Sequence, residues 1–371
     1  MTRHHNIPWL GTWCLPLLSF LLSGCSHPST PDKEEGDTIR LRYSTLLTMV
    51  RHPHYTEVTI ADPWHKGRIL QRLRIEKVFR RALVFTSPHC RLMEDLRCDE
   101  SIAGVCDARY INSPDIRRRL SGRDVSAKTS SIVDCGNAMS PDIERIVALK
   151  PDIIIMSPYD GGSTMATYNN PATITLLAAD YMEPSPLARA EWMKLYGLLF
   201  GCSEVADSLF RYVEKSYLSL KTKAIKLPKG RSILTERKTG ATWYCPGGRS
   251  TVAQLIADAN GGYAFADDTH SGSLALPSEQ VLAKAGNSDI WAFKHNTPQP
   301  LTRRQLLDEY YGYNALKAMR TGNVYQCDAT ATAFFDETPF RPDLLLCEFI
   351  ILLHPEADFG QLRYYKKSLL P

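Results

Sequence analysis

Strong charge of either sign is absent from this sequence. Its 44 Lys and Arg residues nearly balance 40 Asp and Glu residues, which leaves a net charge of +4 over 371 residues. No run of Lys and Arg is long enough to follow a phosphate backbone, which argues against nucleic acid as the main partner. The short basic run 117–119 lies between Asp115 and Asp124 and is typical of a solvated helix face.

The signature motifs of common enzymes are also absent. The sequence contains no GxSxG, HExxH or P-loop motif, and no GxGxxG follows a predicted strand. Its ten histidines are spread thinly, and the pair in His52-Pro53-His54 is too isolated for a metal site. We therefore expect a protein that is not an enzyme, with no catalytic residues, no metal site and no cofactor beyond a bound cargo.

No uninterrupted apolar run reaches the roughly 20 residues of a membrane-spanning helix. Arg3 precedes an uncharged, Leu-rich stretch, 6–24, which is broken by prolines and a glycine and is typical of an export signal. The stretch ends in Leu22-Ser23-Gly24-Cys25, which resembles the lipobox of bacterial lipoproteins. We therefore expect residues 1–25 to be a lipoprotein signal peptide with Cys25 as the lipidation site; an ordinary cleaved signal is the alternative.

Residues 26–38 are polar and contain proline, so they are expected to form a flexible tether. A tethered lipoprotein would be anchored to a bacterial membrane by its lipid and would face the periplasm. The residue after Cys25 is Ser26 and not the Asp that often retains lipoproteins on the inner membrane, which leaves the choice between inner and outer membrane open.

CxxC motifs are missing. Apart from Cys14 in the signal and Cys25, eight cysteines remain: Cys90, Cys98, Cys106, Cys135, Cys202, Cys245, Cys327 and Cys347. An even number in an exported protein permits disulfides without defining the pairs. Several lie within apolar runs, so we expect most of them to be buried free thiols.

One short pattern is present twice. Residues 140–148 (SPDIERIVA) recur in loosened form as residues 276–283 (LPSEQVLA). In both copies a Pro precedes a short helix with a Glu in its first turn, and a strand follows, at 151–156 and 288–293. A unit built twice predicts two similar lobes with a cleft between them, and such clefts bind small ligands.

The remaining pattern predicts the α/β class. Short apolar strands, expected at 58–60, 82–85 and 102–105, alternate with helices, which indicates parallel sheets covered on both faces. Apolar residues at helical spacing follow from 185 to 226, with a possible bend at Gly201. The expected organisation is therefore an N-terminal lobe (39–184), a long connecting helix (185–226) and a C-terminal lobe (227–371). Within the C-terminal lobe, a final helix at 342–353 should pack centrally.

The run from Ser140 to Ile155 closely resembles the N-lobe signature of substrate-binding proteins that serve ABC importers of iron-siderophores, haem and vitamin B12. The C-lobe motifs of these proteins follow in order, including Asn260-Gly261-Gly262, the segment 278–282 and Arg341-Pro342-Asp343. The resemblance spans about residues 80–360. It implies two Rossmann-like lobes joined by a single long helix, and a monomer that delivers a small metal chelate to an ABC permease and its ATPase.

Glu144 and Glu279 fall where this family places one acidic residue per lobe to bind arginines of the permease. Two carboxylates at equivalent positions suit a two-point electrostatic contact. The alternative is that each merely complements the helix dipole, which contributes about 0.3–1 kcal/mol. The two matching positions favour docking.

The ligand is expected at the carboxyl ends of the strands, where loops face the cleft. Aromatic side chains would stack on a flat tetrapyrrole or catecholate, and cations would pair with an anionic complex. Ser87 and His89 are expected in a turn, and Trp243 and Tyr244 in a loop. The candidate ligand-binding residues are Ser87, His89, Asp134, Tyr159, Asp160, Trp243, Tyr244 and Lys294.

The sequence leaves the cargo open among ferric siderophore, haem and corrinoid. Three other functions remain as alternatives. A chelatase-like enzyme would need His89 to face Asp134 or Asp160 across the cleft. A zinc or manganese carrier of a related family, and a scavenger of haem that works without a permease, are the other two.

Overall fold

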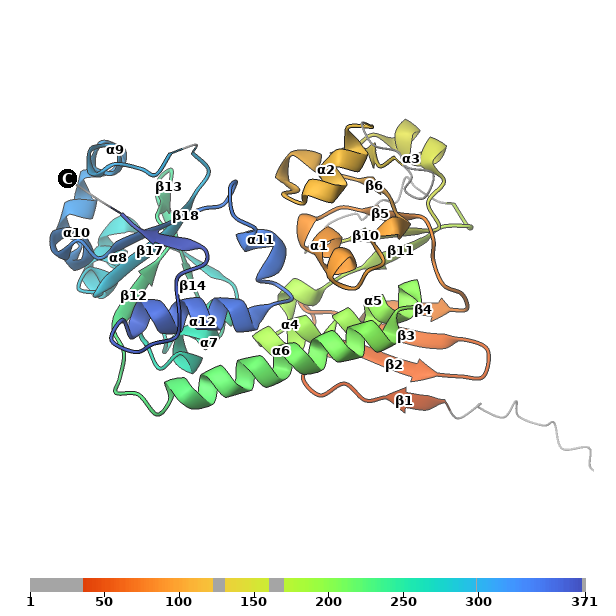
Figure 1. Ribbon diagram of the computed structural model, residues 1–371, viewed down its shortest axis with the longest axis horizontal. Coiled ribbons are helices and arrows are strands. Elements are labelled where there is room, and N and C mark those ends of the chain that lie inside the picture. The colour runs from red at the N-terminus through yellow and green to blue at the C-terminus, as the bar shows by residue number, and fades with distance from the viewer. Residues whose placement is uncertain (1–35, 123–130, 160–169, 298, 369–371) are drawn as a thin grey trace, which may run out of the picture. The chain divides into compact units, whose positions relative to one another are not determined.

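The computed structural model describes residues 36–122, 131–159, 170–297 and 299–368. This part of the chain contains two five-stranded, mainly parallel sheets with helices packed against them (Figure 1). The predicted fold class, two α/β lobes joined by one long helix, is confirmed. The predicted signal peptide and Cys25 lie outside the described residues.

The first parallel sheet has the strand order β11-β10-β5-β6-β7. Its strands are β5 (Ala82–Val84), β6 (Ile102–Val105), β7 (Val133–Asp134), β10 (Ile153–Met156) and β11 (Ile174–Leu177). The helices are α1 (Ser87–Asp95), α2 (Pro114–Leu120) and α3 (Ile143–Leu149), with 3-10 turns η1 (Asp99–Ser101) and η2 (Ala108–Tyr110) and a two-stranded pair, β8 (Gly136–Asn137) and β9 (Ser140–Pro141). Neighbouring side chains of β5 enter different core clusters, Val84 on one face and Leu83 on the other, so both faces are covered.

The second sheet has the order β15-β12-β17-β18-β19, and only β19 is antiparallel to its neighbour. Its strands are β12 (Ser232–Thr235), β15 (Gly262–Tyr263), β17 (Ile290–His295), β18 (Val324–Asp328) and β19 (Tyr365–Lys367). Its helices are α7 (Thr251–Asp258), α8 (Ser278–Ala285), α9 (Arg303–Glu309), η4 (Tyr311–Ala315), α10 (Lys317–Thr321), α11 (Phe334–Glu337) and α12 (Pro342–Leu353). A small antiparallel sheet is made by β13 (Lys238–Thr239), β14 (Thr242–Pro246) and β16 (Ser273–Pro277).

The segment before residue 80 forms a separate sheet. Its antiparallel strands are β1 (Asp37–Ile39), β2 (Leu47–Arg51), β3 (Thr56–Ala61) and β4 (Ile69–Ile75). The strand predicted at 58–60 is therefore real but belongs to this meander and not to a parallel sheet. The end of the predicted tether, Asp37 and Thr38, is in β1, where both residues pair with β2.

Two buried carboxylates attach this meander to the first lobe. Glu191 is fully buried and accepts hydrogen bonds from the backbone N–H groups of Arg42, Tyr43 and Ser44 at 2.8–3.0 Å. Glu183 accepts from the next two backbone N–H groups, those of residues 45 and 46. The backbone N–H groups of this loop would otherwise lack acceptors. They are paired with carboxylates that lie far along the sequence.

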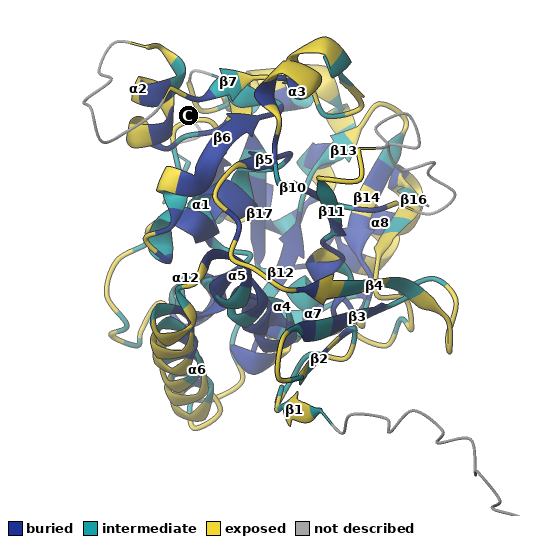
Figure 2. Cartoon of the chain, turned by 90° about the vertical axis from the view of Figure 1, so that its right-hand side faces the viewer, coloured by how far each residue is buried: buried dark blue, intermediate teal, exposed yellow. Residues whose placement is uncertain are grey.

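The helical region 185–226 consists of three helices, α4 (Pro186–Glu191), α5 (Met193–Phe200) and α6 (Ser203–Ala224). Gly201 ends α5 in the left-handed conformation, with a φ of 71°, so the expected bend is a break. Only α6, with 22 residues, continues toward the second sheet (Figure 1). It buries one stripe, which includes Phe210, Val213 and Tyr217, and exposes its outer face (Figure 2).

The two copies of the repeated pattern form equivalent helices. Glu144 is the second residue of α3 and Glu279 the second residue of α8. Their starts differ, however. Asp142 caps α3 by accepting from the backbone N–H of Arg145, whereas Pro277 occupies the cap position of α8. The predicted last helix is α12, which is buried among α6, α7 and α4.

Candidate ligand-binding site

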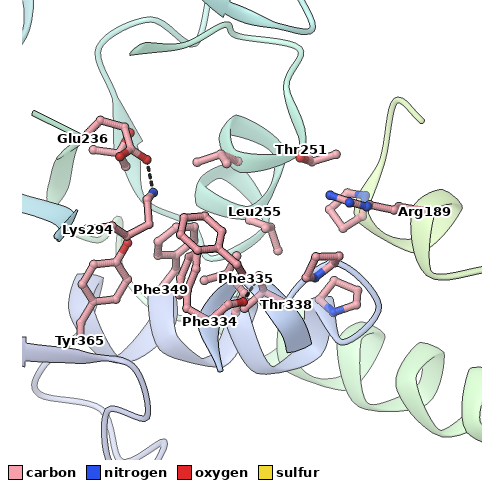
Figure 3. A pocket seen from close by; sticks show the side chains of 16 residues that line it. Arg189, Glu236, Thr251, Leu255, Lys294, Phe334, Phe335, Thr338, Phe349 and Tyr365 are labelled. Atoms are coloured by element: carbon pink, nitrogen blue, oxygen red, sulfur yellow. Dashed lines mark hydrogen bonds and ion pairs between the residues drawn. The ribbon is translucent and has the colours of Figure 1, made fainter. Parts of the chain in front are cut away.

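A cavity of about 200 Å³ lies beside the carboxyl ends of β12 and β17. The second lobe contributes Thr235 and Lys294 from these strands, together with side chains of α7, α11 and α12. The segment before the long helix contributes Pro186 and Arg189 from α4. Arg189 lies on the opposite side of the cavity from Lys294 (Figure 3). Strand ends facing a gap are where α/β proteins bind small ligands.

Cations approach the cavity from two sides. Lys294 forms an ion pair with Glu236, and Arg189 lies across the cavity from it (Figure 3). The Nε of Arg189 donates to Oδ2 of Asp180 at 2.9 Å. Burial acts to raise the pKa of Asp180, but the charges of His89 and Arg189 lower it below its ordinary value. Asp180 therefore remains ionised and holds the guanidinium in place.

Glu236 adopts a left-handed backbone conformation, with a φ of 66°, directly after β12. Its carbonyl accepts a hydrogen bond from Nε1 of Trp291 at 2.8 Å, and its N–H donates to the carbonyl of Ala292 at 3.1 Å. For a residue other than glycine this conformation is unfavourable and is typical of functional sites. The strained backbone directs the Glu236 side chain toward Lys294 at the cavity wall.

Thr235 is 2% exposed, and its Oγ1 has no hydrogen-bond partner among the described residues. It lines the cavity. A buried hydroxyl without a partner loses free energy relative to water, by about 1–3 kcal/mol. This hydroxyl is therefore available to a polar group of a ligand.

Aromatic side chains form the remaining wall. Phe334 and Phe335 come from α11, Phe349 from α12 and Tyr365 from β19 (Figure 3). The Nζ of Lys294 lies 5.3 Å from the ring centre of Phe334, a distance suited to a cation–π contact. Phe335 is 48% exposed and offers a ring face that no core contact fully covers.

A second cavity, of about 340 Å³ and more open, adjoins the first. The two share Glu236, Thr251 and Val252, and Tyr244 lines the second. A third, of about 110 Å³, lies between α1 and α11 and is lined by Ser87. Of the predicted ligand-binding residues, Lys294, Tyr244 and Ser87 thus reach three different cavities.

The other predicted ligand-binding residues lie elsewhere. His89 is in α1 and not in a turn; it is buried, with Nε2 3.0 Å from Oδ1 of Asp180. Trp243 is fully buried in the core against Trp291 and Tyr313. Asp134 and Tyr159 are exposed and line none of the three cavities, and Asp160 lies outside the described residues.

Sequence reasoning missed Arg189, Glu236 and the Phe334-Phe335 pair. Arg189 falls in the region interpreted only as a strut, so nothing marked it. The adjacent phenylalanines, followed by Pro339 and Pro342, do carry a signal: two neighbouring aromatic residues in a short, Pro-bounded helix cannot both face the core. One of them, Phe335, is the exposed ring at the cavity.

The α11 segment also contacts the first lobe. Nη2 of Arg91 in α1 lies 3.4 Å from Oε1 of Glu337, and Nδ2 of Asn112 donates to the carbonyl of Thr332 at 3.4 Å. These contacts place the aromatic wall of the cavity on the same segment that bridges to α1. A shift of α11 would therefore alter the cavity and the contact between lobes together.

Glu144 and Glu279 are both exposed, and neither forms a hydrogen bond or ion pair with the described residues. Among those same residues, no group of three or more His, Cys, Asp or Glu side chains is arranged to hold a metal ion. None of the helices in the described ranges combines the length and apolarity needed to span a bilayer.

The fold and the cleft define a protein that binds a small molecule between two α/β lobes. A family model described as periplasmic binding protein matches residues 112–331, more than half of the chain. The chain belongs to the periplasmic binding protein family.

Individual relatives are distant in sequence. An uncharacterized lipoprotein from Methanocaldococcus jannaschii is 24% identical over 307 residues, which cover 81% of this chain and 72% of the relative. A periplasmic binding protein from Veillonella parvula matches 81% of this chain and 98% of its own at 14% identity, with a TM-score of 0.61. A periplasmic haem-binding protein from Pseudomonas aeruginosa matches 79% and 100% at 16% identity, with a TM-score of 0.59. A siderophore-binding protein from Vibrio cholerae, bound to Fe3+-Desferal, matches 74% and 99% at 15% identity, with a TM-score of 0.51.

Proposed function

We propose that this protein is the lipid-anchored substrate-binding component of an ABC importer. It captures an iron complex, either a siderophore or haem, or a corrinoid, and delivers it to the permease as a monomer. The observation that carries the proposal is the cavity at the ends of β12 and β17, which combines two cations, an aromatic wall and the unpartnered hydroxyl of Thr235. The family membership supports a binding role, and the names of the haem- and siderophore-binding neighbours suggest the class of cargo.

The charge of the cavity bears on the choice of cargo. Arg189 is paired with Asp180, and Lys294 with Glu236, so each cation is accompanied by a carboxylate. The excess positive charge of the cavity is therefore small. A strongly anionic chelate would lose more hydration free energy on entering than it would gain from contacts with the cavity. We expect chelates of low net charge, such as a hydroxamate complex or a corrinoid, to bind more tightly than a triply charged catecholate complex.

Cavity size implies a movement on binding. The volume of about 200 Å³ is below the roughly 300–1,000 Å³ of typical ligand sites. A chelate would enter only if α11 shifts relative to α1, against which it packs and to which Glu337 forms an ion pair with Arg91.

A direct test is to titrate the purified protein with four ligands: haem, cobalamin, a ferric hydroxamate complex and a ferric catecholate complex. Tryptophan fluorescence and absorbance report the binding. The proposal expects saturable binding of one class at a stoichiometry of one. If none of the four binds, the chelate-carrier function is wrong. Turnover of a bound tetrapyrrole would instead support the chelatase alternative. His89 speaks against that alternative because it is buried and paired with Asp180 from its own lobe.

Replacing the unpartnered hydroxyl of Thr235 should have different effects on chelate affinity and on the stability of the fold. We expect Thr235→Val to weaken chelate affinity by about 10-fold, since one hydrogen bond to the cargo is lost. The same variant should unfold at an equal or higher denaturant concentration, because an unsatisfied buried group is removed. Thr235→Ser, which keeps the hydroxyl, is the matched control for affinity. Unchanged affinity in the valine variant would place the cargo away from this residue.

The exposed ring at the cavity should contribute by stacking. Phe335→Ala is expected to weaken chelate binding by about 5- to 10-fold, because a ring contact contributes about 0.5–1.5 kcal/mol beyond its area. Tyr311→Ala removes another exposed ring, on η4, and should leave affinity unchanged. Isothermal titration of both variants measures the difference. Equal affinities would remove α11 from the binding site.

The proposed anchor has its own test. In cells, Cys25→Ser should move the protein from the membrane fraction to the soluble fraction, because the thiol that would accept the lipid is absent. Metabolic labelling with a fatty acid should mark the unmodified chain but not the variant. Labelling at a different residue, or membrane retention of the variant, would contradict the assignment of Cys25.

A further inference from the structure

Two backbone N–H groups at the start of α7 have no acceptor within the described ranges. They belong to Thr251 and Val252, the first two residues of the helix. The next two N–H groups are paired: that of Ala253 donates to Oγ of Ser250 at 3.1 Å, and that of Gln254 to the carbonyl of Ser250 at 3.0 Å. The unpaired groups point out of the helix end, where the helix dipole is equivalent to about half a positive charge.

These two residues lie where the two adjoining cavities meet. Both are half-buried, and both line the cavity of about 200 Å³ as well as the more open one of about 340 Å³. Thr251 is on the same side of the first cavity as Arg189 (Figure 3), and α4, which carries Arg189, packs against α7. The unpaired N–H groups therefore lie beside the space that a ligand would occupy.

A further polar group without a partner lines the first cavity. The side chain of Thr235 is buried, and its Oγ1 has no hydrogen-bond partner in the described part of the chain. Thr235 ends β12 and Thr251 begins α7, so two separate elements direct unpaired donors to one cavity. The oxygens of a carboxylate or a phosphate group accept several such hydrogen bonds at once.

The chain before α7 holds the helix start in place. The N–H of Gly247 donates to the carbonyl of Gly272 at 2.8 Å. The N–H of Arg249 donates to the carbonyl of His270 at 3.0 Å. The packing is so close that a Cβ on Gly247 would lie 2.3 Å from the carbonyl oxygen of His270, so glycine is required here. Because the donors are fixed before a ligand arrives, binding costs little ordering free energy.

Another helix, α12, also begins at this cavity but lacks the same donors. Its first residue, Pro342, lines the cavity and has no backbone N–H. Asp343 follows in the first turn and forms an ion pair with Arg341 at 2.9 Å. The first turn of α7 contains no acidic residue. The positive end of α7 is therefore not neutralised by its own helix, whereas that of α12 is.

The ion pairs at the cavity limit how much negative charge it can hold. Lys294 is paired with Glu236, and Arg189 with Asp180. The donors that remain unengaged are those of the α7 start and the hydroxyl of Thr235. One anionic group can use all of them, whereas a second would lie near the two carboxylates with no free donor.

We propose that the start of α7 and the hydroxyl of Thr235 form a subsite for one carboxylate or phosphate group of the cargo. The N–H groups of Thr251 and Val252 and the hydroxyl of Thr235 donate to its oxygens. This inference rests on the proposed function and narrows it to chelates that carry a pendant anionic group. A corrinoid with its phosphodiester, haem with its propionates and a hydroxamate complex with an acidic arm are of this kind.

A titration with simple anions tests the subsite without any chelate. The full chain, with Thr and Val labelled with 15N, is titrated with sodium phosphate and, separately, with sodium acetate at constant ionic strength. The amide signals of Thr251 and Val252, assigned with Thr251→Ala and Val252→Ala, should shift in a saturable way. Thr235→Val should weaken the affinity for the anion by about 10-fold, because one donor is lost. Absence of a saturable shift at both residues with both anions would overturn the proposal.

A proline at the first position of α7 removes one N–H and keeps the helix. Ser250, the residue before it, has φ −72° and ψ 159°, an extended conformation that a following proline permits. We expect Thr251→Pro to melt at the temperature of the unmodified protein and to bind phosphate about 10-fold more weakly. Thr251→Ala keeps the N–H and should bind phosphate more tightly than the proline variant does. Equal phosphate affinities of the two variants would contradict a role for this N–H group.

Matched pairs of ligands connect the subsite to the cargo. The pairs are haem and its dimethyl ester, cobalamin and cobinamide, which lacks the phosphodiester, and the ferric complexes of N-succinyl and N-acetyl desferrioxamine B. In the pair that the protein binds, the member with the anionic group should bind at least 10-fold more tightly, and Thr251→Pro should reduce this preference. Equal binding of both members would refute the subsite and leave the carrier function standing. Binding of phosphate at Thr251 without binding of any chelate would support the subsite and refute the carrier function.

Discussion

Reversing the charge of both acidic helix tips, with Glu144→Arg and Glu279→Arg together, should abolish chelate uptake by cells without changing chelate affinity. Both residues are exposed, lie at the second position of α3 and α8, and form no ion pair with described residues, so they are free to bind a partner. Placing two like charges against basic groups of a permease costs several kcal/mol, which corresponds to on the order of 100-fold or more in uptake. Uptake of labelled chelate by cells and titration of the purified variant measure the two quantities.

The long connecting helix supplies a matched control for this experiment. Glu204 is also exposed and is also the second residue of its helix, α6. Glu204→Arg therefore disturbs the helix dipole equally, by about 0.3–1 kcal/mol, without touching the proposed docking tips. Single reversals at Glu144 or Glu279 should reduce uptake partially. The docking role is refuted if uptake persists in the double variant, or if chelate affinity falls together with uptake.

Removing the carboxylate of Glu191 should lower the free energy of unfolding more than any other substitution considered. In Glu191→Ala, the partly buried backbone N–H groups of residues 42–44 and the Nζ of Lys194 lose their acceptor, a fully buried carboxylate. Breaking a buried, hydrogen-bonded charge costs about 3–5 kcal/mol. We expect the free energy of unfolding in urea to fall by that amount, and hydrogen exchange to accelerate first in residues 42–46.

Two variants bracket this result. Glu191→Gln keeps one acceptor oxygen and should lose roughly half as much free energy. Glu204→Ala, at an exposed site, should change the free energy of unfolding by less than about 0.5 kcal/mol. A loss below about 1 kcal/mol in Glu191→Ala would show that the segment 42–46 is held mainly by other contacts, such as those of Glu183.

The repeated pattern shows how far sequence reasoning reached. It predicted two equivalent helices with an acid in the first turn, and Glu144 and Glu279 do occupy the same helix position. The bounds of α12 agree with its apolar run because every residue of this helix is buried or partly buried. Such features can be predicted because polarity, helix capping and chain turns depend on residues that are close together in the sequence.

Predictions about individual side chains were less accurate for a definite reason. His89 follows Ser87-Pro88, which resembles a turn, but Pro88 lies in the first turn of α1 and His89 faces Asp180, 91 residues away. Trp243 and Tyr244 are neighbours in β14, so they point to opposite faces, and the tryptophan enters the core while the tyrosine lines a cavity.

The sequence by itself determined the α/β class, the two lobes and the acidic helix tips, because hydrophobic periodicity and helix signals act over a few residues. Tertiary structure alone decided which side chains meet at the cavity. Arg189, Thr235 and Phe335 come from three elements far apart in the chain, and no local pattern marks Arg189 or Thr235. Their proximity results from the packing of α4 and α11 beside the ends of the second sheet, where burial and charge pairing over the whole fold determine the neighbours of each residue.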